Sequence, residues 1–479
     1  MARDAAPGET LAPDLLVIGA GSGGLSVAAG AVQMGASVVL AEGAEMGGDC
    51  LNVGCVPSKA LIAAAHRAAA MRGAGVFGVS PGEGRADWAA VKAHVAGVIA
   101  AIAPHDSQER FEGLGVRVIR DWARFVSPRE VEAGGVRIRP RRVVVATGSR
   151  PFVPPIPGLG DVPYLTNETV FSAPDFPERL LVLGGGPIGI ELAQAFRRLG
   201  AAVTVVEAAA ALGREDPEAA AVVLDRLRAE GVTIREGAPA TAVARTVDGI
   251  AATLADGATV EGSHLLVAVG RRIDLSRLDP EAGGVAATER GVAVDEGLRS
   301  VSNRRVYAVG DAAGRGQFTH LAAHHAGLVI RSALFRLPAR ARGDHVPRVT
   351  FADPELAQVG PTEAEARESG VLREVARFDY AANDRAQAER ATEGFVKVMV
   401  GRRGRVLGAT AVGAQAGELI GLWALAVSKG LTIGAVAGMV APYPTLGEVS
   451  KRAAGAYFAP RLFESLWVRR AVRLLARLG

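Results

Sequence analysis

The architecture of the chain follows from residues 15–24, which read Leu-Leu-Val-Ile-Gly-Ala-Gly-Ser-Gly-Gly. The four apolar residues predict a buried strand, and the glycines predict a tight turn into an Ala-rich helix that ends at Gly35. A second apolar run, residues 38–41, ends at Glu42. This order of strand, turn, helix and strand predicts an α/β unit.

The same unit occurs again in the chain. An apolar run at residues 180–183 leads into Gly-Gly-Gly-Pro-Ile-Gly at residues 184–189, and a strand at 203–206 follows a second helix. The matching positions are each 165 residues apart, namely Gly19 and Gly184, Gly35 and Gly200, and Glu42 and Glu207. The chain therefore contains an internal repeat.

Each repeat is typical of a dinucleotide site. Glycines allow the turn, the close approach of a pyrophosphate to the free helix amides and tight packing of the helix on the strand, and the acid can accept hydrogen bonds from a ribose. A glycine-rich turn without a ligand is the alternative for one such motif, and two in full context disfavour it. The predicted binding residues are Gly19, Gly21, Gly24 and Glu42 in the first repeat and Gly184, Gly186, Gly189 and Glu207 in the second. Two sites suggest a resident flavin and an exchangeable nicotinamide.

The two cysteines of the chain lie within residues 47–59, Gly-Gly-Asp-Cys-Leu-Asn-Val-Gly-Cys-Val-Pro-Ser-Lys. A disulfide between Cys50 and Cys55 would close a short loop and stabilise the fold by only about 2 kcal/mol, so a structural staple is a poor interpretation. The pair precedes a helix expected from Ser58 onward, where amide dipoles favour thiolate, which suits cycling between disulfide and dithiol. A metal site is not predicted, because two cysteines are too few ligands and the nearest histidine is His66. Inert core cysteines are the remaining alternative.

Composition excludes several other classes of protein. The 479 residues suggest about three domains. With 49% hydrophobic and 22% charged residues, the chain can bury large cores. Its formal net charge of +4 is small for this length, so nucleic acid is not an expected partner. The first ten residues show no secretory signal, which favours the cytoplasm, and the nearly uncharged residues 419–444 are interrupted by glycines and prolines, which favours a packed segment over a membrane span.

Five motifs together resemble the FAD-dependent pyridine nucleotide-disulfide oxidoreductases (class I), a family that includes dihydrolipoamide dehydrogenase, glutathione reductase and mercuric reductase. They are residues 47–59, Ala146-Thr147-Gly148, Gly270-Arg271-Arg272, Tyr307-Ala308-Val309-Gly310-Asp311, and Pro444-Thr445-Leu446 with Glu448. The resemblance covers nearly the whole chain. It implies an α/β fold with two Rossmann-like domains, for FAD and NAD(P), and a C-terminal α+β dimerisation domain.

The resemblance also implies a division into domains. The expected parts are a discontinuous FAD-binding domain at residues 1–155 and 273–344, an inserted NAD(P)-binding domain at 156–272, a dimerisation domain at 345–460 and a basic amphipathic tail at 461–479.

Several roles follow from the resemblance. Cys55 would be the thiolate beside the flavin, and Cys50 the outer sulfur that attacks substrate. Lys59 would pair with Glu191 beside the flavin ring, the alternatives being a solvated lysine and a surface acid. Asp311 would bind the sugar-alcohol chain of the flavin, the alternative being an ordinary turn at a strand end. The cofactor set is completed by Gly48, Lys59, Thr147, Gly148, Gly270, Arg271 and Gly310.

The second repeat also bears on the choice of nicotinamide. The carboxylate of Glu207 would accept from a free ribose hydroxyl and repel a 2′-phosphate, and no arginine follows it until Arg214. The sequence therefore favours NADH over NADPH.

The chain departs from the dithiol-handling members of the family at Tyr443. Those members carry a histidine here that acts, with a glutamate matching Glu448, across the interface of a homodimer. A phenol with a pKa near 10 is a poorer proton shuttle than imidazole near 6.5. Tyrosine here resembles mercuric reductase, as do residues 383–386, 392–395 and 318–323, yet the cysteine pairs that deliver Hg(II) in that enzyme have no counterpart in this sequence. Tyr443 filling space at the dimer seam is the alternative.

Two further features concern surfaces. The histidines His320, His324 and His325 are interpreted as packing or surface residues. In the tail, Trp467, Ala471, Leu474 and Leu478 recur at helical spacing beside Arg469, Arg470, Arg473 and Arg477. This helix could make weak contact with an anionic membrane or pack on its own protein.

The sequence thus predicts a homodimeric oxidoreductase that passes electrons from NAD(P)H through FAD and the Cys50–Cys55 disulfide to an acceptor. Candidate acceptors are Hg(II) or another thiol-bound metal, a small-molecule disulfide, or lipoamide. The alternatives are a dihydrolipoyl dehydrogenase, a membrane-surface NADH:quinone-type dehydrogenase that does not need the cysteines, and a redox sensor without turnover.

Overall fold

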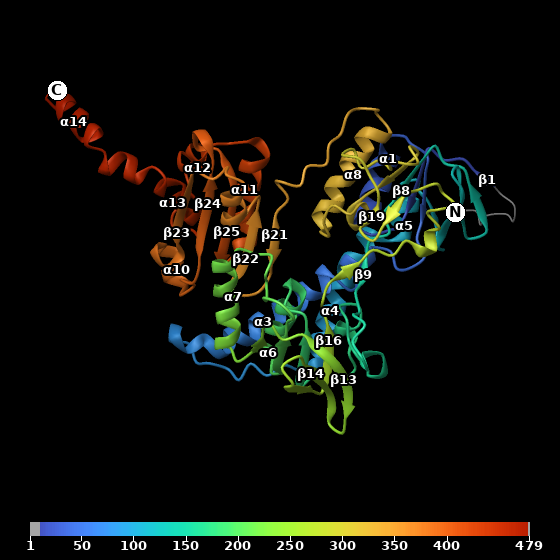
Figure 1. Ribbon diagram of the computed structural model, residues 1–479, viewed down its shortest axis with the longest axis horizontal. Coiled ribbons are helices and arrows are strands. Elements are labelled where there is room, and N and C mark those ends of the chain that lie inside the picture. The colour runs from blue at the N-terminus through green and yellow to red at the C-terminus, as the bar shows by residue number, and fades with distance from the viewer. Residues whose placement is uncertain (1–9, 478–479) are drawn as a thin grey trace. The chain divides into compact units, whose positions relative to one another are not determined.

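The protein is described by a computed structural model of residues 10–477 (Figure 1), which divides into two compact units. The first unit comprises residues 10–184, 198–201 and 240–342, and the second comprises residues 185–197, 202–239 and 343–477. Both units combine sheets with helices, so the predicted α/β class is confirmed.

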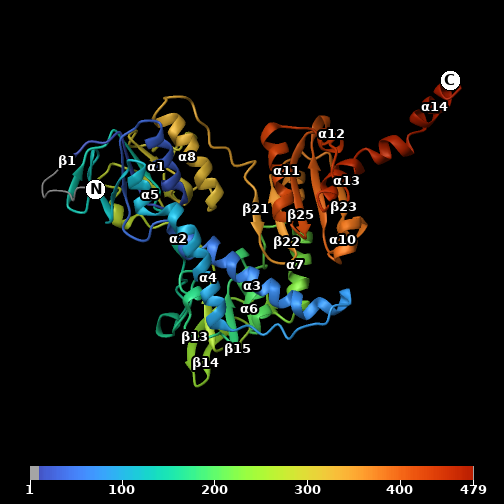
Figure 2. The same cartoon turned by 180° about the vertical axis from the view of Figure 1, so that it is seen from behind.

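A five-stranded parallel sheet forms the centre of the first unit. Its order is β20 (Val306–Ala308), β8 (Arg142–Val145), β2 (Leu15–Ile18), β3 (Val38–Ala41) and β4 (Arg117–Ile119). The strand order reverses at β2, which has β3 on one side and β8 on the other, so the first glycine turn follows the strand at which ligands bind in such sheets. Helices α1 (Ser22–Gln33) and α8 (Thr319–Ala333) pack against each other beside this sheet (Figures 1 and 2).

A second sheet and several helices complete this core. The sheet contains β1 (Thr10–Leu11), β7 (Val136–Ile138), β6 (Glu130–Ala133) and β5 (Ala123–Ser127). Phe125 of this sheet and Leu40 of the parallel sheet are buried in one hydrophobic cluster. The helices that follow the first repeat are α2 (Gly48–Asn52), α3 (Cys55–Gly73), α4 (Trp88–Ile102) and α5 (Gln108–Gly113), with a 3₁₀ turn η1 (Ala74–Phe77) after α3. The helix after the cysteines therefore begins at Cys55, three residues before the expected Ser58.

The remaining strands of the first unit are short or belong to small sheets. They are the parallel pair β10 (Arg179–Leu183) and β16 (His264–Val267), the antiparallel sheet of β13 (Ala240–Thr246), β14 (Gly249–Leu254) and β15 (Thr259–Gly262), and the pairs β9 (Arg150–Pro151) with β17 (Arg271–Arg272) and β18 (Ala287–Thr288) with β19 (Gly291–Val292). A 3₁₀ turn η6 (Gly310–Ala313) follows β20.

The second unit is built on a five-stranded antiparallel sheet. Its order is β21 (Arg348–Thr350), β22 (Glu355–Val359), β25 (Val406–Gly413), β24 (Phe395–Val400) and β23 (Glu374–Asp379). Helices α11 (Ala416–Lys429), α12 (Ile433–Ala437) and α13 (Glu448–Ala456) pack on it, and Trp423 of α11 is fully buried with its Nε1 donating to Ser450 Oγ at 3.1 Å. The other elements are α6 (Pro187–Leu199), β11 (Ala202–Val206) parallel to β12 (Thr233–Arg235), α7 (Pro217–Ala229), α9 (Glu363–Glu368), α10 (Asp384–Glu389), η9 (Pro460–Glu464) and α14 (Leu466–Leu475).

Residues 419–444 pack as expected from the sequence, since Ile420, Trp423 and Val436 lie in the hydrophobic core of this unit. Between residues 10 and 477, no helix is both long enough and apolar enough to cross a membrane.

A buried lysine ties α7 to the antiparallel sheet. Lys397 on β24 is 4% exposed, and its Nζ lies 2.8 Å from Asp216 Oδ2, 3.1 Å from Glu363 Oε2 and 3.2 Å from Glu218 Oε2. Burial works against the charge, but the hydrogen bond to Asp216 and the two further carboxylates raise the pKa of Lys397 overall. Asp216 also caps the N-terminus of α7 by accepting from the amides of Glu218 and Ala219. The lysine therefore neutralises acids contributed by two helices.

Replacing Lys397 by alanine is expected to lower the free energy of unfolding by about 3 kcal/mol or more, because it leaves the buried carboxylate of Asp216 without its cation. The matched control is Arg385→Ala, which removes an exposed pair with Glu389 and should change stability by less than about 0.5 kcal/mol. Denaturant unfolding measures both. Equal losses in the free energy of unfolding would show that the buried cluster stabilises the protein no more than the exposed pair does.

Candidate active site

The two glycine turns of the repeat have the same geometry. Gly19 and Gly184 follow strands β2 and β10 with φ of +105° and +110°. A Cβ at either position would lie 2.4 Å from a backbone carbonyl oxygen, that of Ala146 for Gly19 and that of Ala268 for Gly184. Only glycine fits both the backbone conformation and the space.

The acid that ends each repeat is fastened to its own turn. Each carboxylate accepts from two backbone amides, one directly after the first glycine and one two residues beyond the acid. The distances are 2.5 and 2.6 Å at Glu42 and 2.7 and 2.9 Å at Glu207. The repeat found in the sequence is therefore also a repeat of hydrogen bonds.

The first turn has the features that a dinucleotide requires. Helix α1 starts at a glycine N-cap, Gly21, with no side-chain cap for its amides, so these donors are available to a phosphate. A Cβ on Gly21 would meet only the Cα of Gly48, at 4.0 Å, which leaves open space at the turn, whereas a Cβ on Gly24 would lie 1.8 Å from Gly19 O. Gly48 has a φ of +59° and a Cβ there would lie 2.7 Å from Gly21 Cα, which explains a glycine at that position.

The second turn repeats this arrangement in part. A Cβ on Gly186 would meet no atom within 4 Å, and Gly189 is buried in the first turn of α6. The geometry of both turns is compatible with the dinucleotides that the sequence predicts there.

Two predicted cofactor residues, Asp311 and Arg271, are linked by Ser149, which sequence reasoning missed. Ser149 Oγ donates to Asp311 Oδ2 at 2.5 Å and accepts from Arg271 Nε at 2.8 Å. Burial raises the pKa of Asp311. Thr147 and Gly148 directly precede Ser149, and Gly270 directly precedes Arg271. The position of Ser149 after Ala-Thr-Gly was the only sequence signal for it.

Arg271 also reaches the cysteine motif. Its Nη2 lies 3.3 Å from Asp49 Oδ2, and its Nη1 donates to Asn167 Oδ1 at 3.4 Å. Asn167 in turn donates to Asp49 Oδ1 at 3.4 Å. Asp49 stands beside Cys50 in the motif, but nothing in the sequence marked Asn167.

Gly310 is positioned by a histidine. Its amide donates to Nδ1 of His325, which is 1% exposed. Burial, followed by the charges of His324 and Arg315, lowers the pKa of His325 to about 4, so the ring is neutral and can accept. His325 is therefore a packing residue, as expected, and it also fixes the turn that carries Asp311. His320 and His324 are exposed.

The two thiols lie at the start of a long helix. Cys55 is the first residue of α3, and its Sγ lies 3.5 Å from Oγ1 of Thr319, the first residue of α8. Both cysteines are free, Cys55 being exposed and Cys50 half-buried. The amino ends of two helices therefore meet at one sulfur, where their dipoles favour a negative charge.

The two thiols differ in acidity. A hydrogen bond from Cys50 lowers the pKa of Cys55 to about 6 against the effect of burial, and the Thr319 hydroxyl and the charge of Lys59 act in the same direction. The hydrogen bond to Cys55 and burial raise the pKa of Cys50 well above its usual range. At neutral pH the pair therefore holds one thiolate, on Cys55, and one thiol, on Cys50.

Lys59 and Glu191 belong to different units, so their pairing stays a prediction. Lys59 is half-buried in the second turn of α3. Glu191 in α6 is 6% exposed, and its Oε1 accepts from the amide of Phe351 at 2.9 Å. Glu191 is therefore not a surface acid.

Tyr443 is held by a carboxylate of the second unit. Its hydroxyl donates to Asp384 Oδ2 at 2.9 Å, and this hydrogen bond raises the pKa of Tyr443. The ring is 67% exposed. Asn383, next to Asp384, donates to Thr445 O at 3.1 Å. Glu448 starts α13, with its Oε1 4.0 Å from Arg452 Nε. Residues 383–386 were singled out in the sequence, but their contact with Tyr443 was not.

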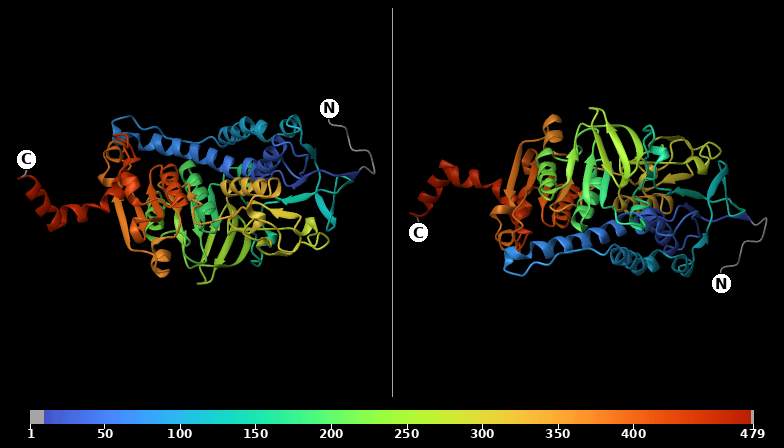
Figure 3. Two further views of the ribbon diagram at one scale, coloured as in Figure 1. Left: turned by 90° about the horizontal axis from the view of Figure 1, so that it is seen from above. Right: turned by 90° about the horizontal axis from the view of Figure 1, so that it is seen from below.

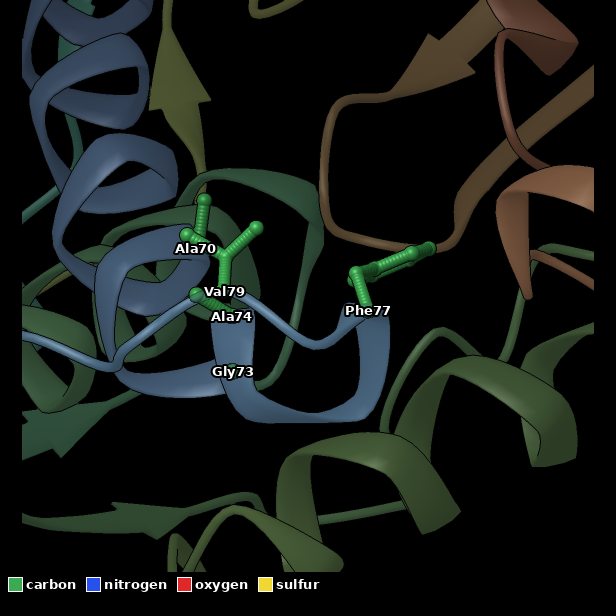
Figure 4. A pocket seen from close by; sticks show the side chains of 5 residues that line it. All are labelled: Ala70, Gly73, Ala74, Phe77 and Val79. Atoms are coloured by element: carbon green, nitrogen blue, oxygen red, sulfur yellow. The ribbon is translucent and has the colours of Figure 1, made fainter.

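One cavity lies away from these residues. It has a volume of about 380 Å³ and is lined by Ala70, Gly73, Ala74, Phe77 and Val79, at the end of α3 remote from Cys55 (Figure 4). Its lining carries no titratable or nucleophilic group, so it offers no chemistry of its own. Over the described part of the chain, no group of three or more His, Cys, Asp or Glu side chains is placed to hold a metal ion.

Replacing Thr319 by valine is expected to raise the pH at which the reduced thiol pair ionises by about one unit, because it removes one hydrogen bond to the thiolate. Ser58→Ala is the control, since the Ser58 hydroxyl donates to the backbone oxygen of Cys55 and not to its sulfur. Thiolate absorbance as a function of pH measures both. An unchanged midpoint in the valine variant would contradict the role of Thr319.

Comparison with known proteins agrees with this geometry. A family model described as pyridine nucleotide-disulphide oxidoreductase matches residues 13–326, and the model of its dimerisation domain matches residues 346–454. The mercuric reductase of Streptomyces lividans is 36% identical over 452 residues, covering 92% of this chain and 95% of that protein. The dihydrolipoyl dehydrogenase of Thermus scotoductus is 36% identical over 458 residues, covering 92% of this chain and 97% of that protein.

Solved structures give the same result. LpdA from Mycobacterium tuberculosis matches with a TM-score of 0.85 and 28% identity, over 92% of this chain and 99% of that one. The HOCl-induced flavoprotein disulfide reductase RclA from Escherichia coli matches with a TM-score of 0.83 and 27% identity, over the same shares. The chain therefore belongs to the pyridine nucleotide-disulphide oxidoreductase family, as an FAD-dependent oxidoreductase that uses a pyridine nucleotide and carries the dimerisation domain through which such chains form homodimers.

Proposed function

We propose that this protein passes electrons from NAD(P)H through FAD to Cys50 and Cys55, and from these to a thiol-bound metal ion or a small disulfide. The observation that carries the proposal is the difference in acidity between the two thiols. Cys55 is acidic at the start of α3, and Cys50 keeps its proton. Such a pair is suited to repeated opening and closing of a disulfide, because each sulfur has a separate task.

The residues of the chain would act as follows. Bound FAD supplies the transfer of an electron pair between the nicotinamide and the Cys50–Cys55 disulfide. With a disulfide acceptor, Cys50 attacks one sulfur and its proton passes to the sulfur that leaves, so a mixed disulfide forms and one thiol is released. The Cys55 thiolate then attacks Cys50, which closes the internal disulfide and releases the second thiolate. With a metal acceptor, Cys50 and Cys55 would instead replace the thiolates that carry the ion, the Cys50 proton leaving on one of them. The ion would then take two electrons from the pair as the Cys50–Cys55 disulfide closes.

Tyr443 supports the metal-bound class of acceptor. Its hydroxyl is tied to Asp384, which raises the pKa of Tyr443, so the phenol keeps its proton near neutral pH. A group that does not titrate near pH 7 is a poor acid-base catalyst for dihydrolipoamide, whereas exchange of a soft metal between thiolates needs no such catalyst. Relatives named mercuric reductase and a relative named dihydrolipoyl dehydrogenase are both 36% identical to this chain, so the preference for a metal-bound acceptor rests on Tyr443.

The remaining assignments belong to this proposal. In the homodimer, Tyr443 and Glu448 would reach Cys50 of the other subunit. Asp311 and Arg271 would serve FAD, and Lys59 would pair with Glu191 near the flavin. The domain limits would be 1–155 with 273–344 for FAD, 156–272 for the nicotinamide and 345–460 for dimerisation. The 2.7 and 2.9 Å hydrogen bonds fix Glu207 where it would accept from a ribose and repel a 2′-phosphate, which favours NADH.

The proposal is tested with the FAD-loaded enzyme, NADH and four acceptors: dithiol-bound Hg(II), a small aromatic disulfide, lipoamide and a soluble quinone. Wild-type enzyme should reduce the metal complex or the disulfide fastest. In Cys50→Ser these rates should fall at least about 1,000-fold, because the attacking sulfur is gone, while residual quinone reduction should persist.

Two outcomes would contradict the proposal. Quinone reduction as the fastest reaction, unaffected by the serine, would establish the cysteine-independent dehydrogenase. Negligible turnover with every acceptor would establish a redox sensor.

Tyr443→His should raise NAD⁺-dependent oxidation of dihydrolipoamide by about tenfold or more, because imidazole titrates near neutral pH. The same substitution should not raise metal reduction. Tyr457→Phe is the control, since Tyr457 packs with Arg461 and not with Asp384. If the histidine variant gains no dihydrolipoamide activity, Tyr443 does not occupy the proton-shuttle position.

A further inference from the structure

The C-terminal segment leaves the second unit as a helix without a buried face. After α13 and η9, helix α14 spans Leu466–Leu475, and the hydroxyl of Ser465 caps it by accepting from the amide of Val468 at 3.4 Å. None of its described residues is buried. In Figures 1–3 it projects from the sheet and helices of its own unit. Over the described residues, packing of this helix on the sheet and helices of its own unit is therefore absent.

The start of the segment is nevertheless anchored. Arg461 forms a salt bridge with Glu374 of β23 at 2.5 Å, and its guanidinium lies over the ring of Tyr457 at 3.8 Å. This anchor holds the start of η9 on the sheet of its own unit.

Helix α14 separates apolar from basic side chains around its axis. At 100° per residue, six apolar side chains occupy one arc of about 160° and the arginines occupy the opposite arc, where Leu466, the first residue of the helix, also lies. The apolar arc holds Trp467, Val468, Ala471, Val472, Leu474 and Leu475, and the basic arc holds Arg469, Arg470 and Arg473, with Arg477 just beyond the helix. Trp467, Leu474 and Leu475 are 79%, 62% and 64% exposed. Leu478, expected on the apolar face, lies outside the described residues.

The charge of this segment has one sign. From Ser465 onward the sequence contains four arginines and no aspartate or glutamate. The preceding turn adds two exposed apolar side chains, Leu462 at 48% and Phe463 at 70%. A surface that covers the helix must therefore accept apolar side chains and positive charge together.

Helix α14 is too short to span a membrane. Ten residues rise about 15 Å, half of the roughly 30 Å of a bilayer core, and arginines are costly there. The same residues suit a helix that lies in the plane of the membrane–water interface. Its apolar side chains would enter the boundary of the acyl chains while the arginines remain at the level of the phosphates. Tryptophan favours the same depth.

We propose that α14, with Leu462 and Phe463 before it, docks this protein on the surface of a membrane that contains anionic lipid. Charge complementarity selects this occupant: a neutral surface would bury the apolar arc but leave the arginines without partners. The proposal does not depend on the acceptor of the enzyme, because none of these residues belongs to the candidate active site.

The test uses the full-length FAD-loaded protein and sedimentation with vesicles of phosphatidylcholine containing 30% phosphatidylglycerol, or of phosphatidylcholine alone. The protein should bind the anionic vesicles, and binding should weaken as salt is raised. Replacing Arg469, Arg470 and Arg473 by glutamine should weaken binding about 100-fold, because each arginine that is lost reduces the affinity by about tenfold or less. Leu474→Ser with Leu475→Ser should also abolish most binding.

The control removes three exposed arginines elsewhere in the same unit, Arg402, Arg403 and Arg405, by substitution with glutamine, and binding should be unchanged. NADH-dependent turnover in solution should be the same in all variants. The proposal is overturned if no vesicle binds the protein or if neutral vesicles bind it equally. It is also overturned if a chain that stops before Pro460 becomes monomeric, because a second copy of the chain would then be what covers the helix.

Discussion

The negative charge on one sulfur is the feature on which the rest of the structure depends. Cys55 is the first residue of α3, where its sulfur accepts a hydrogen bond from Cys50 and contacts Thr319 at the first turn of α8. The helix that presents Cys55 and the helix that presents Thr319 are separated by more than 250 residues in the chain, and both belong to the first unit. The parallel sheet therefore acts as the frame that brings two helix ends to one atom. Because the Cys50 thiol stays protonated, the pair carries a single negative charge, on Cys55.

The two glycine turns share one pattern of hydrogen bonds. The same carboxylate-to-amide clamp holds Glu42 in the first unit and Glu207 in the second, and each clamp leaves a glycine, Gly21 or Gly186, beside open space. A turn that is already fixed by its own acid needs less ordering when a phosphate binds. The network of Asp311, Ser149 and Arg271 reaches Asp49 beside Cys50, so the residues proposed to serve the flavin are connected to the cysteine motif of the first unit.

The sequence predicted those parts of the site that reside in contiguous motifs. The repeat at Gly19 and Gly184 could be found because glycine is the only residue that tolerates both the positive φ and the nearby carbonyl. Thr319, Ser149 and Asp384 were not assigned, because a hydroxyl or a carboxylate gains its role only from a neighbour distant in the chain. The helix was expected from Ser58, after Pro57, whereas α3 begins at Cys55, two residues before that proline, because the first turn of a helix tolerates a proline whose missing amide would have no partner there. The exposure of α14 was one of two open alternatives, since an amphipathic pattern does not state what covers its apolar face.

The most direct measurement of the central claim is the long-wavelength absorbance that a thiolate gives beside an oxidised flavin, recorded against pH in enzyme reduced by two electrons. Because the pKa of Cys55 is lowered to about 6, the band of the wild-type enzyme should be present at pH 7.5 and fall with a midpoint near pH 6. The serine variants have no disulfide to reduce, so they are recorded without reductant, with the flavin oxidised, and the band should be present in Cys50→Ser and absent in Cys55→Ser. A band that is missing from the wild-type enzyme, that titrates near the ordinary pKa of a cysteine, or that depends on Cys50 and not on Cys55 would contradict the account.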